Sequence, residues 1–483
     1  MSPRLLSPMM WRTPGPRRSD RRRCVSGRGL PGHSINEDYV RAGLGPPISI
    51  ADGPGWAMRR AGGFAVGIVA PRGTFDIRPD DVGLWQFVEG LVRGTFERCG
   101  YREIRTPMFE HTELFERGVG STTDIVEKEM YTFKDRGGRL ITLRPEGTAP
   151  VVRAFVEHGM AGRALPAKLY YMGPMFRYER PQAGRYRQFH QFGMEVIGAA
   201  GPEADAEVIA MPLEIFRAMG IQDVVVNLNS IGCPVCKPAY RERLRDAYAP
   251  VLDRLCPSCK SRYDRNPLRL LDCKSEECRA ALPEPPTIFA QLCPECSAHF
   301  EALGRLLDKL GVGYMINPRL VRGLDYYTKT TFEYNVGGIG SQDAIGGGGR
   351  YDGLVEECGG PPTPGVGVAC GMERCVLAAQ AHTAGQEHQT GLDVFIVSLG
   401  EAARERAFEL AHSMRRAGLA VDFDMIGRGL KAQMRYADKM RARFVAIVGD
   451  DELAAGEATV KDMSTGEQTR IAQTELATCV RRK

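Results

Sequence analysis

Four short stretches of the sequence carry arginine, glutamate, tyrosine and glycine at a density that could do chemistry. A guanidinium group stays charged at physiological pH and its planar fork matches phosphate oxygens, so Arg177, Arg322 and Arg374 could clamp a polyphosphate. Considered alone, Arg177 could equally form a surface ion pair with Glu179. The stretches run from Leu143 to Thr148, from Phe176 to Glu195, from Arg322 to Tyr327 and from Gly346 to Arg374.

Polar residues of the second stretch share one face of a predicted strand. Residues 188–197 are expected to be extended, and side chains two residues apart then point the same way, which groups Gln191, Gly193 and Glu195. A glutamine and a carboxylate facing one cleft could orient a small polar cation. The glycines at 337–353 would let the backbone approach a ligand closely, although 346–349 alone could be a flexible turn. The run is not a P-loop, because no Gly-Lys-Ser/Thr follows it.

A second kind of chemistry is indicated by cysteine spacing. Between residues 233 and 296 the chain has four close pairs, three spaced Cys-x2-Cys and one Cys-x4-Cys. Such a pair brings two thiolates to one ion, so the pattern predicts one or two tetrahedral structural zinc sites, with the pairing left open. The alternative is a small helical domain with reduced thiols. The cysteines are Cys233, Cys236, Cys256, Cys259, Cys273, Cys278, Cys293 and Cys296.

Composition indicates a folded protein of about three domains. The 483 residues are 43% hydrophobic and 25% charged, which is ordinary for globular chains. The longest apolar run, residues 61–70, is half the length of about 20 residues that a membrane span needs, so no membrane association is expected. Fourteen cysteines without a secretory signal favour reduced thiols or metal ligands, and a cytoplasmic location is expected. The net charge of +5 permits a nucleic-acid partner.

The N-terminal residues 1–60 differ from the rest of the chain. They contain eleven arginines, no lysine and no apolar periodicity, and cannot bury enough surface to offset their ordering entropy. This segment is expected to be a disordered extension, or an untranslated stretch before a true start near Met58. An organellar transit peptide is the third interpretation.

Periodicity predicts the elements that must position these residues. Helices are expected at 82–99, 203–219 and 300–310, another near residue 371, and strands at 139–143, 169–175, 188–197, 224–229 and 330–336. A polar spacer at 381–389 separates a final portion that alternates strand and helix from 393 to 448. That order predicts a small, largely parallel α/β domain.

Together the stretches resemble the three signature motifs of class II aminoacyl-tRNA synthetases, in the family's order. Motif 1 is similar to residues 100–107, motif 2 to Phe176-Arg177-Tyr178-Glu179, and motif 3 to residues 365–374. Residues 320–327 and 347–353 resemble the two histidine-specific motifs of histidyl-tRNA synthetases. The resemblance extends from about residue 71 to the C-terminus.

The resemblance implies an α+β protein with an antiparallel-sheet catalytic core, a Cys-rich insertion and a C-terminal α/β anticodon-binding domain. The core would comprise residues 61–232 and 299–385, the insertion 233–298 and the anticodon-binding domain 390–483. A homodimer formed through motif 1 is also implied.

The implied activity is that of a histidine–tRNA ligase, which uses ATP with Mg²⁺ to make histidyl-adenylate and then charges the histidine tRNA. Arg177 and Arg322 would be catalytic at the α-phosphate, with Glu179 also at ATP and Arg374 at the γ-phosphate. The implied L-histidine-binding residues are Glu146, Gly147, Thr148, Gln191, Glu195, Tyr326 and Tyr327. In the loop after motif 2, Arg180, Gln182 and Arg187 would approach the tRNA acceptor end, or would simply be a solvated basic loop.

Two alternatives belong to other classes of protein. One is a non-catalytic paralogue, such as the regulatory subunit that partners ATP phosphoribosyltransferase, which would lack the C-terminal domain and intact motifs. The other is a class II synthetase for another amino acid, which would lack the stretch from Arg322 to Tyr327.

Overall fold

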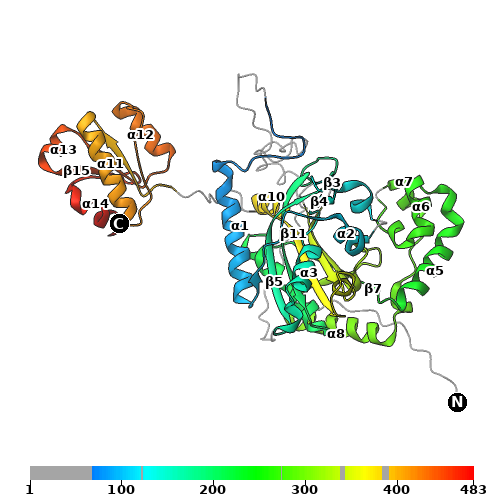
Figure 1. Cartoon of the computed structure of the whole chain (residues 1–483). Helices are drawn as coiled ribbons and strands as arrows, with labels where there is room; N and C mark the ends of the chain where they lie inside the picture. The colour runs from blue at the N-terminus through cyan, green and yellow to red at the C-terminus, as the bar shows by residue number, and fades with distance from the viewer. Residues whose placement is uncertain (1–67, 121–122, 274, 338–342, 383–390, 483) are drawn as a thin grey trace, which may run out of the picture. The chain divides into compact units, whose positions relative to one another are not determined.

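An eight-stranded sheet forms the centre of the larger domain, which the resemblance predicts to be catalytic (Figure 1). The computed structural model describes residues 68–120, 123–273, 275–337, 343–382 and 391–482. Neighbouring strands of this sheet are antiparallel except at its two edges, where β1 pairs with β5 and β7 with β8 in parallel. In spatial order the strands are β1 (Arg102–Glu103), β5 (Ala167–Phe176), β6 (Gln188–Ile197), β11 (Gly365–Gly371), β10 (Ala344–Arg350), β9 (Thr328–Val336), β7 (Val224–Gly232) and β8 (Tyr314–Ile316).

The expected antiparallel core is confirmed, but the interpretation of residues 346–349 as a flexible turn is wrong. These four glycines lie in β10, which is hydrogen-bonded on one side to β9 and on the other to β11. A local pattern indicated a turn because glycine is rare inside strands. Hydrogen bonds to the two neighbouring strands hold these glycines in an extended conformation that their residue type alone does not favour.

Four long helices cover one face of the sheet. In α1 the apolar residues predicted at helical spacing are buried, among them Trp85, Val88, Val92 and Phe96, and the next turn passes through Gly100 at φ +80°. They pack on sheet residues such as Met194 of β6. The covering helices are α1 (Pro79–Arg98), α4 (Pro202–Ala218), α8 (Pro294–Leu310) and α10 (Met372–His382).

The opposite face of the sheet holds a second, smaller core built from short elements. A three-stranded antiparallel sheet in the order β2-β4-β3 lies beside it. The elements are β2 (Phe109–His111), α2 (Thr112–Phe115), η3 (Glu116–Gly120), η4 (Ile125–Glu129), β3 (Tyr131–Lys134), β4 (Leu140–Leu143), α3 (Thr148–Glu157), η5 (Met160–Gly162) and α9 (Leu354–Glu357).

The Cys-rich insertion is a helical lobe between β7 and α8, drawn in green in Figure 1. It has its own small core around Tyr240, Leu244, Tyr248 and Leu270. Its elements are α5 (Cys236–Tyr248), η6 (Ala249–Arg254), α6 (Pro257–Arg265), η7 (Pro267–Leu270), α7 (Glu276–Ala281) and η8 (Ile288–Gln291).

The C-terminal domain is a five-stranded sheet in the order β13-β12-β14-β15-β16. The predicted alternation is confirmed for β12 (Val394–Ser398), α11 (Glu401–Arg416), β13 (Val421–Phe423), α12 (Leu430–Lys439) and β14 (Phe444–Val448). Its three strands are parallel, as expected. The sheet continues with two antiparallel strands, β15 (Glu457–Asp462) and β16 (Gln468–Ala472). The connection between these two strands is too short for a parallel crossover. Helix α13 (Asp450–Ala455), η9 (Gln473–Glu475) and α14 (Leu476–Arg482) complete it.

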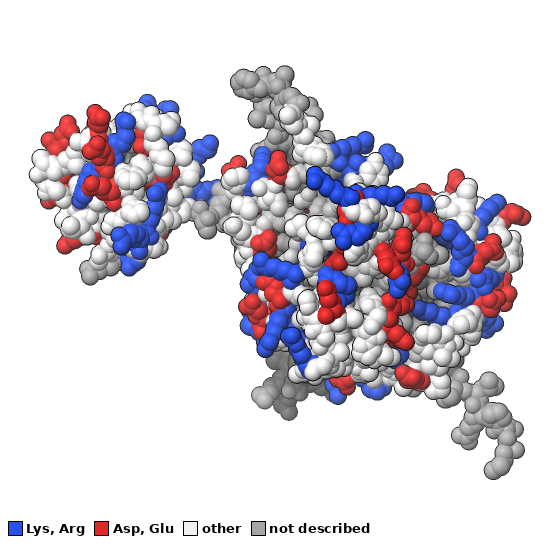
Figure 2. Space-filling model, viewed as in Figure 1, with Lys and Arg blue, Asp and Glu red and all other residues white. Residues whose placement is uncertain are grey.

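Three further expectations concern the chain as a whole. The N-terminal segment 1–60 lies outside the described residues. The first two residues of the spacer expected at 381–389 are the last two of α10, and the rest of the spacer also lies outside the described residues. Within the described ranges, none of the helices combines the length and apolarity that crossing a bilayer requires. On the face shown in Figure 2, acidic and basic side chains are interspersed over the catalytic core and over the C-terminal domain.

Candidate active site

Strand register brings the predicted polar residues of β6 to the face of the sheet that the long helices leave open. Met194 and Val196 of β6 pack under those helices, so Gln191, Gly193 and Glu195 lie on the other face, as the alternation predicts. Residues in register on neighbouring strands share that face. They are Tyr171 of β5, Gly367, Ala369 and Gly371 of β11, Gly347 and Gly349 of β10, and Thr331 and Glu333 of β9.

Glycines on this face leave room for the larger side chains that lie across the strands. A Cβ at Gly367 would lie 1.7 Å from Oε2 of Glu195. At Gly347 it would lie 2.6 Å from Nη1 of Arg322, and at Gly349 2.8 Å from the ring of Tyr327. The glycine-rich stretch therefore permits close approach, but the groups that approach it in this structure are side chains of the chain itself.

Glu195 is a fully buried carboxyl group between two hydroxyl donors. Its Oε1 accepts a 2.7 Å hydrogen bond from Thr148, and its Oε2 accepts a 2.6 Å hydrogen bond from Tyr351. Burial raises the pKa of Glu195 to about 8, although both hydroxyls favour the ionised form. Tyr351 was not singled out from the sequence as a site residue. Its signal was its position in the second histidine-motif stretch.

Glu146 caps the helix that carries Thr148. Its two carboxyl oxygens accept backbone hydrogen bonds of 2.7 Å from Thr148 and 2.8 Å from Ala149, at the first turn of α3. Burial raises its pKa. Gly147 lies between Glu146 and Thr148 in the chain, and a Cβ at this position would be 2.2 Å from the ring of Tyr171. Close packing against this ring therefore explains why a glycine occupies the position.

Buried aromatic rings lie next to these two carboxyl groups. The ring centroids of Tyr326 and Tyr327 are 4.6 Å apart, and those of Tyr326 and Tyr351 are 5.9 Å apart. Burial raises the pKa of all three phenols, which keeps them neutral hydroxyl donors. Tyr326 donates a long 3.4 Å hydrogen bond to Glu146. Nearby, Oε1 of Gln191 is buried and has no hydrogen-bond partner among the described residues.

Three arginines from separate segments lie near one another. Arg177 donates from Nε to the carbonyl of Pro145 at 2.9 Å, and Arg322 donates from Nη1 to Glu333 at 2.7 Å. Burial lowers the pKa of Arg374, and the charges of Arg177 and Glu333 lie near enough to act on it too. Glu333 was not predicted from the sequence. Its only signal was that alternation along β9 places it on the same face as Thr331.

The surface ion pair considered for Arg177 and Glu179 is a long contact. Their closest atoms are 3.9 Å apart, and both side chains are largely buried, at 21% and 11% exposure. Glu179 instead pairs with Arg185 at 2.5 Å. Of the predicted tRNA-contacting residues in this loop, Arg180 is exposed, whereas Arg187 stacks on the ring of Tyr178.

Comparison with known proteins identifies the family. Residues 73–235 and 268–375 match the family model described as histidyl-tRNA synthetase, and residues 393–483 match the anticodon binding domain model. The chain belongs to the histidyl-tRNA synthetase family. The second match argues against the non-catalytic paralogue, which would lack that domain, and the first against a synthetase for another amino acid.

Relatives and solved structures agree with this assignment to the histidyl-tRNA synthetases. The chain is 55% identical over 406 residues to a histidine–tRNA ligase of Desulforamulus reducens, covering 84% of this chain and 97% of that protein. It is 53% identical over 401 residues to that of Moorella thermoacetica, covering 83% and 95%. The apo crystal structure of the S. aureus histidyl-tRNA synthetase is 40% identical, with a TM-score of 0.73 over 86% of this chain and 99% of that one.

One arginine of the second histidine-motif stretch is structural. Arg350 follows the glycines of β10, but its guanidinium is fully buried on the helix-covered face, where it pairs with Asp205 of α4. It also donates to the carbonyl of Ala199 at 2.9 Å. The second histidine-motif stretch thus combines an anchor, Arg350, with a site residue, Tyr351.

The insertion contains two groups of four cysteines, each of which could hold one metal ion, so the structure shows which of the close pairs in the sequence meet. Within each group all the Sγ atoms lie within 4.8 Å of one another. The family model leaves residues 236–267, in the middle of this region, unmatched. One group is Cys233, Cys236, Cys293 and Cys296, and the other is Cys256, Cys259, Cys273 and Cys278.

Proposed function

We propose that the face of the eight-stranded sheet away from the four long helices is where the chain activates histidine. The chain is a histidine–tRNA ligase: it converts L-histidine and ATP to histidyl-adenylate and pyrophosphate, and then transfers histidine to the 3′ end of its cognate tRNA. The observation that supports this location is the buried Glu195, which accepts hydrogen bonds from the hydroxyls of Thr148 and Tyr351 on the sheet face that also carries Glu333, the partner of Arg322.

Histidine selection follows from hydrogen bonding in a buried hollow. Glu195 and Tyr327 are proposed to bind the imidazole, with Tyr326 lining the hollow. An apolar amino acid could not form the additional hydrogen bonds that an imidazole would make with this buried carboxyl group and phenol. Sites of this kind reject analogues that lack the hydrogen-bonding group by about 10⁴-fold or more.

The α-amino group of histidine would be held at the other end of the hollow. Gln191 supplies the buried oxygen that lacks a partner in the described residues. The hydroxyl of Thr148 donates its hydrogen to Glu195 and so keeps its lone pairs for an ammonium donor. Each oxygen of Glu146 already accepts one backbone N–H, and a carboxylate oxygen can accept a second hydrogen bond.

The arginines would stabilise negative charge while the histidine carboxylate attacks the α-phosphate of ATP. Arg177 and Arg322 are proposed at the α-phosphate, with Glu179 at the nucleotide and Arg374 at the γ-phosphate. The ion pair with Glu333 orients Arg322 over the glycines of β10 before substrate binds. The guanidinium group then needs little rearrangement in the transition state, which lowers the activation free energy. ATP would bring Mg²⁺, which neutralises part of its phosphate charge.

The proposal includes a homodimer that acts on tRNA in the cytoplasm. Two large apolar side chains, Phe109 and Phe133, are about half exposed on the same face of the β2-β4-β3 sheet, which follows motif 1 in the chain. A patch of this kind supports a subunit interface. Light scattering of the purified chain should give twice its mass of 53.2 kDa, and the monomer mass would contradict the dimer.

ATP–pyrophosphate exchange measured with each of the twenty amino acids tests the function. Exchange is expected with histidine alone, and exchange driven by another amino acid would overturn the proposal. Arg322→Ala should lower the histidine-dependent rate about 10²–10³-fold, the usual effect of removing one preorganised donor, without changing the unfolding transition. Arg319→Ala is the matched control, because its guanidinium lies three residues away and pairs with the exposed Glu284.

A further inference from the structure

We propose that each group of four cysteines binds one zinc ion, and that the two ions make the insertion a rigid support for the segment from Arg322 to Tyr327. The metal sites go beyond the proposed function. Their effect on catalysis rests on the proposed role of Arg322.

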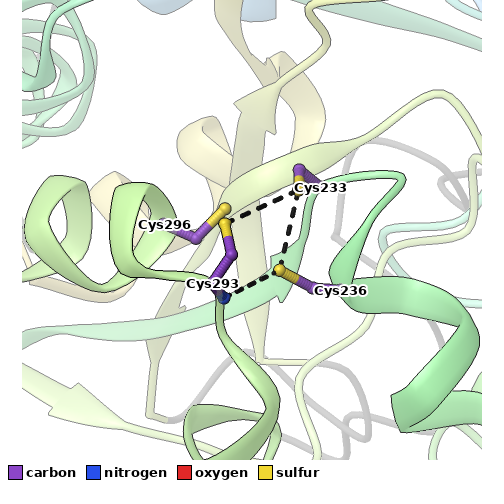
Figure 3. A group of neighbouring side chains, drawn as sticks. All are labelled: Cys233, Cys236, Cys293 and Cys296. Carbon is purple, nitrogen blue, oxygen red and sulfur yellow. Dashed lines mark hydrogen bonds between the residues drawn. The ribbon is translucent and has the colours of Figure 1, made fainter.

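The first group has the dimensions of a tetrahedral metal site (Figure 3). The Sγ atom of Cys233 lies 3.6 Å from that of Cys236 and 4.0 Å from that of Cys293. Four sulfurs about 2.3 Å from a zinc ion lie about 3.8 Å from one another. A disulfide would need about 2.05 Å, and none of these cysteines is paired in that way.

Backbone groups around the sulfurs favour thiolates in both groups. The amide of Cys293 donates to Sγ of Cys236 at 3.1 Å, and the amide of Cys256 donates to Sγ of Cys278 at 2.9 Å. Cys256 and Cys293 also stand at the N-caps of α6 and α8, where the helix dipole stabilises negative charge. Metal-bound thiolates are stabilised by the same arrangement.

The size of the insertion supplies an independent argument for metal. The lobe from α5 to η8 is shorter than the roughly 70 residues below which a hydrophobic core alone rarely maintains a fold. Its helices α6 and α7 have nine and six residues, too few to be stable alone. A zinc ion bound by the first group of cysteines would connect the two ends of the lobe. The second ion would connect α6 to α7 within it.

Next to the first group, the insertion contacts the backbone of the first histidine-motif stretch. Lys237 follows Cys236 at the start of α5 and donates from Nζ to the carbonyl of Tyr327 at 2.6 Å. A lysine held at a metal-fixed helix start thus supports one end of the stretch.

The second group fixes a more extensive contact. Arg269, in η7 between Cys259 and Cys273, is buried and donates to the carbonyls of Arg322 at 3.0 Å and Gly323 at 2.7 Å. Nδ2 of the neighbouring Asn266 donates to Asp325 at 3.3 Å. These bonds orient the backbone from which the Arg322 side chain projects. Arg269 is therefore a positioning residue.

Metal content of the full chain purified without added metal tests the sites. Two equivalents of zinc per chain are expected, and one equivalent in each of the double variants Cys236→Ser/Cys296→Ser and Cys259→Ser/Cys278→Ser. Cys479→Ser, in the C-terminal domain, should keep both ions. Less than half an equivalent of zinc in the unmodified chain, or iron in its place, would overturn the proposal whether or not the variants fold.

The positioning role is tested with Arg269→Ala in histidine-dependent pyrophosphate exchange. The kcat should fall about tenfold or more while the KM for histidine changes little and both zinc ions are retained, because only the alignment of the Arg322 backbone is lost. Arg269→Lys should restore part of the rate, and Arg279→Ala, an exposed arginine of α7, should leave it unchanged. An unchanged kcat in Arg269→Ala would refute the role. Failure of the proposed function would instead appear as exchange with another amino acid.

Discussion

Replacing Glu195 with glutamine should change how the stability of the catalytic core depends on pH. The residue is fully buried, and burial raises its pKa from an ordinary value of 4.5 to about 8. Glutamine has nearly the same shape and cannot ionise. The variant therefore isolates the cost of ionising this one carboxyl group.

The sign and size follow from proton linkage. In the unfolded chain Glu195 releases its proton near pH 4.5, whereas in the folded chain it keeps the proton up to about pH 8. Between these values the folded state binds the extra proton, so raising the pH destabilises it, by about 5 kcal/mol over the whole interval. From pH 6 to pH 8 alone the free energy of unfolding should fall by about 2 kcal/mol relative to Glu195→Gln, because the group is already half ionised at pH 8.

Urea unfolding at pH 6, 7 and 8 measures this difference, with fluorescence of the buried Trp85 reporting on the catalytic core. Titration of other groups cancels in the comparison between wild type and variant. Glu214→Gln, an exposed glutamate of α4, is the control and should show no such trend. A difference between wild type and Glu195→Gln that is the same at all three pH values would refute the reasoning.

Three further outcomes are expected around the same carboxyl group. Gly367→Ala should destabilise the core by about 1–3 kcal/mol through overpacking, whereas Gly353→Ala, with no atom within 4 Å of its Cβ, should cost less than about 0.5 kcal/mol in urea unfolding. Tyr351→Phe removes a donor that favours the ionised form, so the pKa of Glu195 should rise and the pH series should shift to higher pH; an unshifted series would contradict the 2.6 Å bond. Glu195→Ala should raise the KM for histidine about 10–100-fold, from a hydrogen bond of about 1.5–3 kcal/mol, and an unchanged KM would remove its assignment to the imidazole.

Regular elements were predictable because their patterns are local. The strand expected at 188–197 agrees with β6 at both ends, and helix α4 begins and ends one residue before the span expected at 203–219. In both, apolar residues repeat at the period of the element. The glycines of β10 have no side chains to make a pattern, so their strand was missed.

Partners of the site residues were not predictable in the same way. Arg322 and Tyr351 lie in motif stretches and Glu333 follows the alternation of β9, but none of these signals indicates that Arg322 pairs with Glu333, that Tyr351 donates to Glu195, or that Arg269 contacts the backbone of Arg322. Each contact joins segments that strand order or the insertion brings together.

The sequence by itself carried the resemblance to the family, and its residue types and spacing indicated the chemistry expected at the arginines and carboxylates and the existence of close cysteine pairs. Tertiary structure alone decided which four cysteines meet, why β10 and β11 need glycines, and that burial raises the pKa of Glu195. The physical reason is the separation along the chain of the residues on which each property depends. Periodicity and motif chemistry depend on neighbours in the chain, whereas ligand geometry, steric fit and desolvation depend on neighbours in space.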